Sequence, residues 1–238
     1  ARRVKAQGLQ LLVDFHYSDS WADPGKQPKP AAWKEGPGDQ GRQALDDYTF
    51  SVCSGLKAQG TPPDMVQIGN EINGGLLWPD GSTAHWDNLA ALLTAGYQAV
   101  KACSPDTRVM LHLAEGGNNA LFQSWFDQAI ARHVPFDLIG VSYYPYWHGT
   151  LADLQNNLND LTARYDKDVL VAETAYPFTT QDKDGFGNII SANPVPGYDF
   201  TPAGQQRFLA DLLAIVRAVP NGRGLGIFYW EPAWTAVP

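Results

Sequence analysis

Six short runs of apolar residues lie along the sequence, and turn-forming or charged residues bound each of them. Segments such as VQIG (66–69) and LIGV (138–141) do not alternate regularly between apolar and polar residues. This pattern is typical of parallel strands that are covered on both faces. We therefore predict strands at residues 9–15, 64–69, 107–113, 137–143, 168–173 and 224–230.

Between these runs, apolar residues recur every three or four positions, which indicates amphipathic helices. In the first such segment the repeat consists of Leu45, Tyr48, Val52 and Leu56. We predict helices at residues 43–59, 86–102, 121–132, 151–165 and 202–219. Thr201 and Pro202 suit the N-cap and the first position of the last helix. Alternating strands and helices predict a parallel α/β fold in one domain over residues 1–238.

The two ends of the sequence suggest which α/β fold this is. Residues 1–7 resemble the end of a helix, with Gly8 as its stop, and no helix follows the sixth strand. We expect a (β/α)8 TIM barrel that lacks its first two strands and its last helix, and hence a longer natural protein. A doubly wound open sheet is the alternative, but no glycine-rich phosphate loop follows the first strand.

Composition narrows the classes of function. The 238 residues are 44% hydrophobic and 18% charged, with a formal net charge of −8, which disfavours nucleic acid and anionic membranes as partners. No apolar run approaches the 18 residues of a membrane-spanning helix. Two cysteines, Cys53 and Cys103, are too few for a disulfide scaffold or a four-thiolate zinc site. We interpret them as small buried hydrophobic residues.

Polar and aromatic residues follow every predicted strand, where an α/β barrel gathers its active site. Glu71 and Glu173 come at the ends of two strands, and glycosidic hydrolysis needs two carboxyl groups across the scissile bond. Asn70 could hold a sugar hydroxyl beside Glu71. Aromatic residues make up 12% of the chain, and several tryptophans lie in loop-like contexts where flat rings could stack on sugars.

Five sequence blocks resemble the arabinogalactan endo-β-1,4-galactanase family, in the same order and over nearly the whole chain. The first block, DFHYSDSWADP at residues 14–24, is highly specific. The others are IGNE with GLLWP (68–71 and 75–79), GVSYYP (140–145), VAET (171–174) and FYWEPAW (228–234). The family's first two strands, with an arginine of its site, and its final helix have no counterpart here.

The resemblance implies a retaining mechanism in which Glu71 is the acid/base and Glu173 the nucleophile, without a cofactor. It implies endo-acting cleavage of β-1,4-galactan, a pectin side chain. Because polymeric galactan cannot readily enter a cell, we expect a secreted protein, and we expect it to be a monomer. Tyr144 would orient Glu173. The expected substrate-binding residues are His16, Trp21, Asp23, Asn70, Trp78, His112, Tyr144 and Trp230. His112 and Trp230 could equally form the wall of the cleft.

A second motif lies at residues 182–188, where oxygen-bearing positions alternate around a glycine as in the first half of a calcium loop. The expected ligands of a structural calcium ion are Asp182, Asp184, Phe186 through its carbonyl, and Asn188. A polar glycine-rich turn is the alternative. For the whole protein, the alternatives to a galactanase are another retaining β-glycanase, such as a mannanase or endoglucanase, and a non-catalytic galactan-binding barrel.

Overall fold

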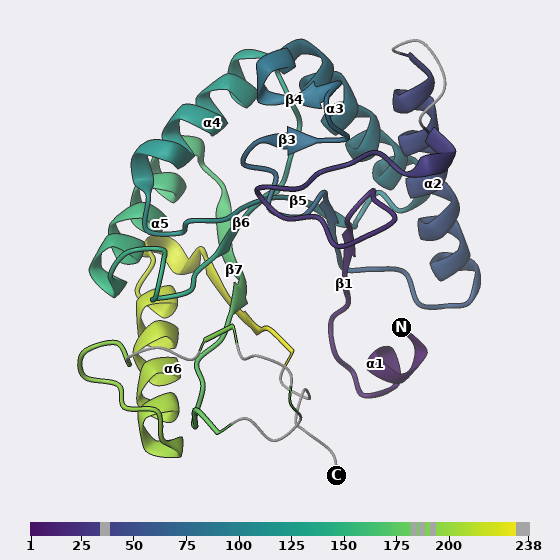
Figure 1. Ribbon diagram of the computed structural model, residues 1–238. Coiled ribbons are helices and arrows are strands. Elements are labelled where there is room, and N and C mark those ends of the chain that lie inside the picture. The colour runs from purple at the N-terminus through teal and green to yellow at the C-terminus, as the bar shows by residue number, and fades with distance from the viewer. Residues whose placement is uncertain (34–38, 182–184, 186–188, 191–193, 232–238) are drawn as a thin grey trace. The chain divides into compact units, whose positions relative to one another are not determined.

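The computed structural model describes residues 1–33, 39–181, 185, 189–190 and 194–231 (Figure 1). The chain forms two compact units. Unit 1 comprises Ala1–Ala114 and Ala120–Gly140, and unit 2 comprises Glu115–Asn119 and Val141–Pro238. The strand that follows Asp137 crosses the boundary, so its first residues belong to unit 1 and its last residues to unit 2.

Six strands form a sheet in the order β1-β2-β5-β6-β7-β8. The β1-β2, β2-β5 and β7-β8 pairs are parallel. Five of the six strands begin and end within one residue of the prediction, and β1 begins three residues later than predicted. The strands are β1 (Leu12–Phe15), β2 (Met65–Ile68), β5 (Arg108–Leu113), β6 (Leu138–Ser142), β7 (Asp168–Thr174) and β8 (Gly224–Tyr229). Every residue of β2 and β6 is buried, as the unbroken apolar runs predicted.

All five predicted helices are present. They are α2 (Asp39–Ala58), α3 (Trp86–Cys103), α4 (Asn119–Ala131), α5 (Leu151–Tyr165) and α6 (Pro202–Arg217). A short α1 (Arg2–Ala6) precedes Gly8, whose positive φ of 69° is the expected helix stop. The N-cap of α6 is also as predicted, because the Thr201 hydroxyl accepts the N–H of Gly204 at 3.0 Å.

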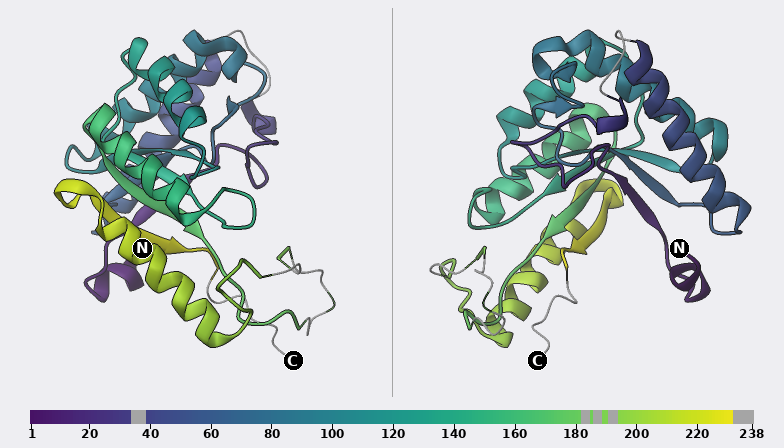
Figure 2. Two further views of the ribbon diagram at one scale, coloured as in Figure 1. Left: turned by 90° about the vertical axis from the view of Figure 1, so that its left-hand side faces the viewer. Right: turned by 45° about the vertical axis from the view of Figure 1, so that its right-hand side comes forward.

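Each unit covers its strands with helices. In unit 1, α2 and α3 lie side by side, and Gly96 of α3 lets the helix approach Ile68 of β2 and Leu45 of α2 closely (Figure 1). In unit 2, α6 runs beside β8, while α5 contacts both α6 and β7 (Figure 2). Thr150 and Asp153 cap the first turn of α5 reciprocally.

We interpreted the two cysteines as small buried hydrophobic residues, and the structure confirms their burial but shows them bonded to each other. Cys53 of α2 and Cys103 of α3 are buried, but they are joined by a disulfide between residues 50 positions apart. The pattern of each helix places its cysteine on the buried face but says nothing about which residue of the neighbouring helix it meets. Packing of α2 against α3 brings the two sulfur atoms together.

A small antiparallel hairpin, β3 (Gly75–Leu76) with β4 (Gly81–Ser82), was not predicted. Its base tolerates no side chains. A Cβ on Gly75 would lie 2.1 Å from the carbonyl oxygen of Gly81, and a Cβ on Gly81 would lie 2.3 Å from that of Leu76. The loop of the hairpin carries Trp78, whose N–H donates to the carbonyl of Gln27 at 2.7 Å. Among the described residues, three short 3₁₀ helices complete the elements: η1 (Ala31–Trp33), η2 (Thr83–His85) and η3 (Pro220–Gly222).

Candidate active site

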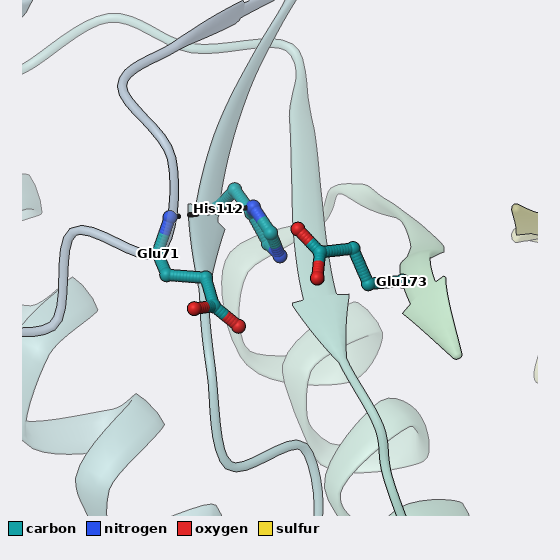
Figure 3. Close-up of side chains that lie close together, drawn as sticks. All are labelled: Glu71, His112 and Glu173. Carbon is teal, nitrogen blue, oxygen red and sulfur yellow. Dashed lines mark hydrogen bonds between the residues drawn. The ribbon is translucent and has the colours of Figure 1, made fainter. Parts of the chain in front are cut away.

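Glu71 follows β2 after Gly69 and Asn70, and its backbone is unusual. Its φ of 48° lies in the left-handed region, which costs a non-glycine residue about 1–3 kcal/mol and occurs preferentially at functional sites. The peptide N–H of Glu71 donates to Nδ1 of His112 at 3.4 Å (Figure 3). The neighbouring Ile72 N–H donates to the carbonyl of His112 at 2.9 Å. Contacts with β5 therefore hold the turn that presents Glu71.

Asn70 is buried beside Glu71, and its polar atoms are bonded. Its Nδ2 donates to the carbonyl of Ala22 at 2.8 Å, and its own carbonyl accepts Nε2 of Gln27 at 2.7 Å. The same Gln27 nitrogen reaches the carbonyl of Glu71 at 3.4 Å. The segment after β1, through Ala22 and Gln27, thus holds the Asn70 side chain and the carbonyl groups of Asn70 and Glu71.

His112, on β5, is 0% exposed. Burial, with a smaller effect from the charge of His16, lowers the pKa of His112 to about 3. The imidazole is therefore neutral at any pH at which the protein would work. A neutral imidazole has one N–H donor and one nitrogen acceptor, and its neighbours determine which nitrogen carries the proton.

His16 follows β1 and forms a second ordered imidazole. Its Nδ1 accepts the N–H of Ala22 at 2.9 Å, so its Nε2 carries the proton that faces Oδ2 of Asp14 at 3.2 Å. Burial raises the pKa of Asp14, while the contacts with His16 and Gln67 oppose that rise. The ring of Trp21 packs edge-on against His16 and is 61% exposed. Trp21 therefore offers an accessible aromatic surface in unit 1.

Asp23 and Trp78 are both held by local contacts. Oδ1 of Asp23 accepts the N–H of Gly25 at 2.8 Å, which makes the carboxylate part of its own turn. Trp78 precedes a cis proline, and its indole Nε1 donates to the carbonyl of Gly74 at 2.8 Å. The Trp78 ring is thereby fixed at the tip of the β3–β4 hairpin.

In unit 2, Glu173 lies near the end of β7 and is 9% exposed. The hydroxyl of Tyr144 donates to its Oε2 at 3.0 Å, and the peptide N–H of Tyr143 donates to its carbonyl at 2.9 Å. Figure 3 shows the Glu173 side chain on its strand. A hydroxyl donor stabilises the charged form of a carboxylate and fixes its orientation. The Glu173 side chain is thus buried and held in a defined orientation.

The predicted residues still to be placed are Trp230 and the four expected calcium ligands. Trp230 follows β8, is partly exposed, and donates its N–H to the carbonyl of Thr174 at 2.8 Å. The four expected calcium ligands, Asp182, Asp184, Phe186 and Asn188, lie outside the described residues.

Three polar residues around these side chains were not identified from the sequence. Gln27 and Gln67 are both buried, and His148 orders the loop of Tyr144 by accepting its N–H at 3.2 Å. Gln67 lies inside the apolar VQIG run, where we interpreted the segment simply as a buried strand. A polar residue within a fully buried strand needs hydrogen-bond partners, and this is the signal that could have identified Gln67.

A parallel α/β sheet whose strands are followed by carboxylates and exposed aromatic rings defines the class of barrel-type glycoside hydrolases. The sequence profile described as glycosyl hydrolase family 53 matches residues 1–238. The chain therefore belongs to glycosyl hydrolase family 53, and its fold is the parallel α/β architecture of that family's barrels.

Three relatives illustrate the similarity. An uncharacterized protein in the bgaB 5′ region of Niallia circulans is 46% identical over 98% of this chain and 67% of its own length. Arabinogalactan endo-beta-1,4-galactanase A of Aspergillus niger is 39% identical over 98% of this chain and 67% of its own length. The solved Ignisphaera aggregans GH53 catalytic domain is 43% identical with a TM-score of 0.94, covering 98% of this chain and 66% of its own. The chain thus spans about two thirds of these relatives.

Proposed function

We propose that the protein is a retaining endo-β-1,4-galactanase, with Glu71 as acid/base and Glu173 as nucleophile. Membership of family 53 and the similarity to the Aspergillus niger galactanase support this function. The observation that carries the assignment of the nucleophile is the hydrogen bond from Tyr144 to Glu173. Retention requires the two carboxyl groups to lie about 5–5.5 Å apart across the scissile bond. A crystal structure of the full-length protein would measure that separation.

The reaction proceeds in two displacements. Glu71 donates its proton to the glycosidic oxygen while Glu173 attacks the anomeric carbon, so the C–O bond to the leaving sugar breaks as an ester to Glu173 forms. Glu71, now ionised, then takes a proton from water, whose oxygen attacks the anomeric carbon and releases Glu173. The ionised Glu173 needs the donor that Tyr144 supplies, and Glu71 must be protonated at the start of each cycle.

Single variants of the full-length protein separate the two roles. Glu173→Ala should abolish hydrolysis of both galactan and an aryl galactoside with an acidic phenol as leaving group. Glu71→Ala should lower kcat/KM on galactan by about 10²–10⁴-fold. It should affect the aryl substrate far less, because an acidic phenol leaves without protonation. Reducing ends and released phenol are the measurements. Retained galactan hydrolysis in Glu173→Ala would remove Glu173 as nucleophile.

Substrate choice needs its own experiment. The full-length protein should release reducing ends from β-1,4-galactan and far fewer from mannan or cellulose. Preference for mannan or cellulose would make it another retaining β-glycanase. Binding of galactan without hydrolysis would make it a carbohydrate-binding barrel.

We further propose that the protein is secreted and acts as a monomer on pectin side chains. A polymer cannot readily enter a cell, and the Cys53–Cys103 disulfide supports an oxidising compartment. Among the described residues, every helix is too short or too polar to cross a lipid bilayer. Light scattering coupled to gel filtration would test the monomer, and a mass near twice that of one chain would contradict it.

A structural calcium ion at residues 182–188 is also part of the proposal. It rests on the alternating oxygen-bearing residues of the sequence and has no part in the chemical steps. Elemental analysis should find about one calcium per chain, and a chelator should lower Tm without changing kcat measured at low temperature. A calcium-free protein whose Tm is insensitive to both calcium and chelator would exclude the site.

A further inference from the structure

Gln67 is a buried glutamine at the centre of β2, with 2% of its surface exposed. Its register partners are Asp14 on β1 and Met110 on β5. A buried carboxamide costs free energy unless its polar atoms are bonded, so its presence among apolar neighbours requires an explanation.

The amide nitrogen of Gln67 faces three polar atoms at once. Nε2 lies 2.8 Å from Oδ1 of Asp14, 3.0 Å from Oδ1 of Asn70 and 2.9 Å from Nδ1 of His112. An amide nitrogen carries two hydrogens. One serves Asp14, and the other is shared between Asn70 and His112.

These contacts determine which nitrogen of His112 carries the proton. Nδ1 receives two donors, Nε2 of Gln67 at 2.9 Å and the N–H of Glu71 at 3.4 Å. Nδ1 must then be the acceptor, which assigns the proton to Nε2. A competing arrangement is close by, because Oδ1 of Asn70 lies 3.2 Å from Nδ1 and could accept a proton from it. Gln67 opposes that arrangement by donating to both atoms.

We propose that Gln67 is a positioning residue for Glu71: it fixes the Nε2–H tautomer of His112, and His112 in turn holds the peptide N–H of Glu71. Without Gln67, a proton on Nδ1 would bond to Asn70 and face the N–H of Glu71, donor against donor. The turn that keeps Glu71 at a φ of 48° would then lose one of its contacts. This inference rests on the proposed role of Glu71 as acid/base.

The test begins with the tautomer itself. Side-chain ¹⁵N NMR of His112 in the full-length wild-type protein should show a neutral ring protonated at Nε2. A ring protonated at Nδ1 would overturn the proposal without any variant. Gln67→Met keeps the length of the side chain and removes both donors, and it should shift the proton toward Nδ1. An unchanged tautomer in a folded Gln67→Met protein would also overturn the proposal.

Values of kcat/KM on the two substrates then test whether Gln67 acts through Glu71. Gln67→Met should lower kcat/KM on galactan about 10–100-fold but change it less than about threefold on the aryl galactoside, whose leaving group needs no acid. Equal losses on both substrates would indicate a general structural role and contradict the proposal. The matched control is Thr107→Val. Thr107 immediately precedes β5, and its buried hydroxyl donates to the carbonyl of Pro63, a hydrogen bond that the variant removes. It should lower Tm but leave both kcat/KM values unchanged.

The NMR result separates this inference from the proposed function. If the wild-type protein does not hydrolyse galactan, the proposed function fails, while the tautomer and its dependence on Gln67 are still measured directly. If galactan is hydrolysed and the tautomer differs from Nε2–H, the function stands and the positioning role of Gln67 is wrong.

Discussion

His112 is an imidazole enclosed by protein, and its burial has a consequence for stability. The unfolded chain binds a proton at this histidine near pH 6.5, whereas the folded protein does so only near pH 3. Between these values the unfolded state holds more protons, so the stability contributed by neutral His112 falls as the pH falls through this window. The loss has an upper limit of about 5 kcal/mol.

Replacing His112 by asparagine should flatten this dependence. The amide oxygen of His112→Asn can accept the N–H of Glu71 as Nδ1 does, but it cannot titrate. We expect the free energy of unfolding of the wild-type protein to fall more steeply than that of the variant between pH 6.5 and 4. Urea denaturation at a series of pH values measures both. Parallel curves would mean that His112 is accessible to protons in the folded state.

The candidate site residues show what sequence reasoning can propose and where it stops. Glu71 and Glu173 could be selected because each follows an apolar run, and strand ends gather at the active site of a barrel. Gln67 was not selected: a glutamine inside a buried run signals that it needs hydrogen-bond partners, but it gives no sign that these lie on two other strands. The left-handed backbone of Glu71 is contacted by His112 and Gln27, which are distant in sequence.

Among the elements, α2 and α3 are the pair with a covalent connection. The Cys53–Cys103 disulfide closes a loop of 50 residues, for which the chain-entropy estimate of stabilisation is about 4 kcal/mol. We expect the double variant Cys53→Ser/Cys103→Ser to have a Tm lower by roughly 5–15 °C. Scanning calorimetry measures it.

Wild-type protein with and without reductant is the control for this variant. Reductant should lower the Tm of the wild-type protein toward that of the variant and leave the variant unchanged. Equal Tm values for oxidised wild type and variant would show that packing alone holds α2 against α3.

The main strands and helices could be predicted because each has a periodicity that its own residues create. The β3–β4 hairpin could not, because strands of two residues have no periodicity, and these form through contacts with each other and with α3. The disulfide likewise depends on which turns of α2 and α3 meet. Strand β1 is shorter than predicted because its pairing with β2 begins at Leu12 and Met65, and Leu9 and Gln10, which come before, are exposed.

At the scale of the whole chain, the net charge of −8 bears on the proposed action on pectin side chains. Galactan is neutral, but in pectin it is attached to an acidic galacturonan backbone that repels an acidic protein. Raising the ionic strength from 0.01 to 0.15 M shortens the screening length from about 30 to 8 Å. We expect this change to raise kcat/KM on pectin-attached galactan by roughly two- to fivefold.

Free galactan is the control for this effect, and its hydrolysis should not respond to salt over the same range. Reducing-end release under matched galactose content measures both substrates. An equal salt response on the two would indicate that charge acts on the protein itself rather than on its approach to the polymer.

The close backbone approach at Gly75 and Gly81 limits which residues of the β3–β4 hairpin can be substituted. Because Gly75 and Gly81 leave no space for even a methyl group, the base of the hairpin is closed to amino-acid exchange. At the tip, Pro79 and Asp80 are exposed, whereas the Trp78 ring is held by its hydrogen bond to Gly74. Libraries that graft a new recognition loop should therefore vary residues 79 and 80 and keep Trp78 and both glycines.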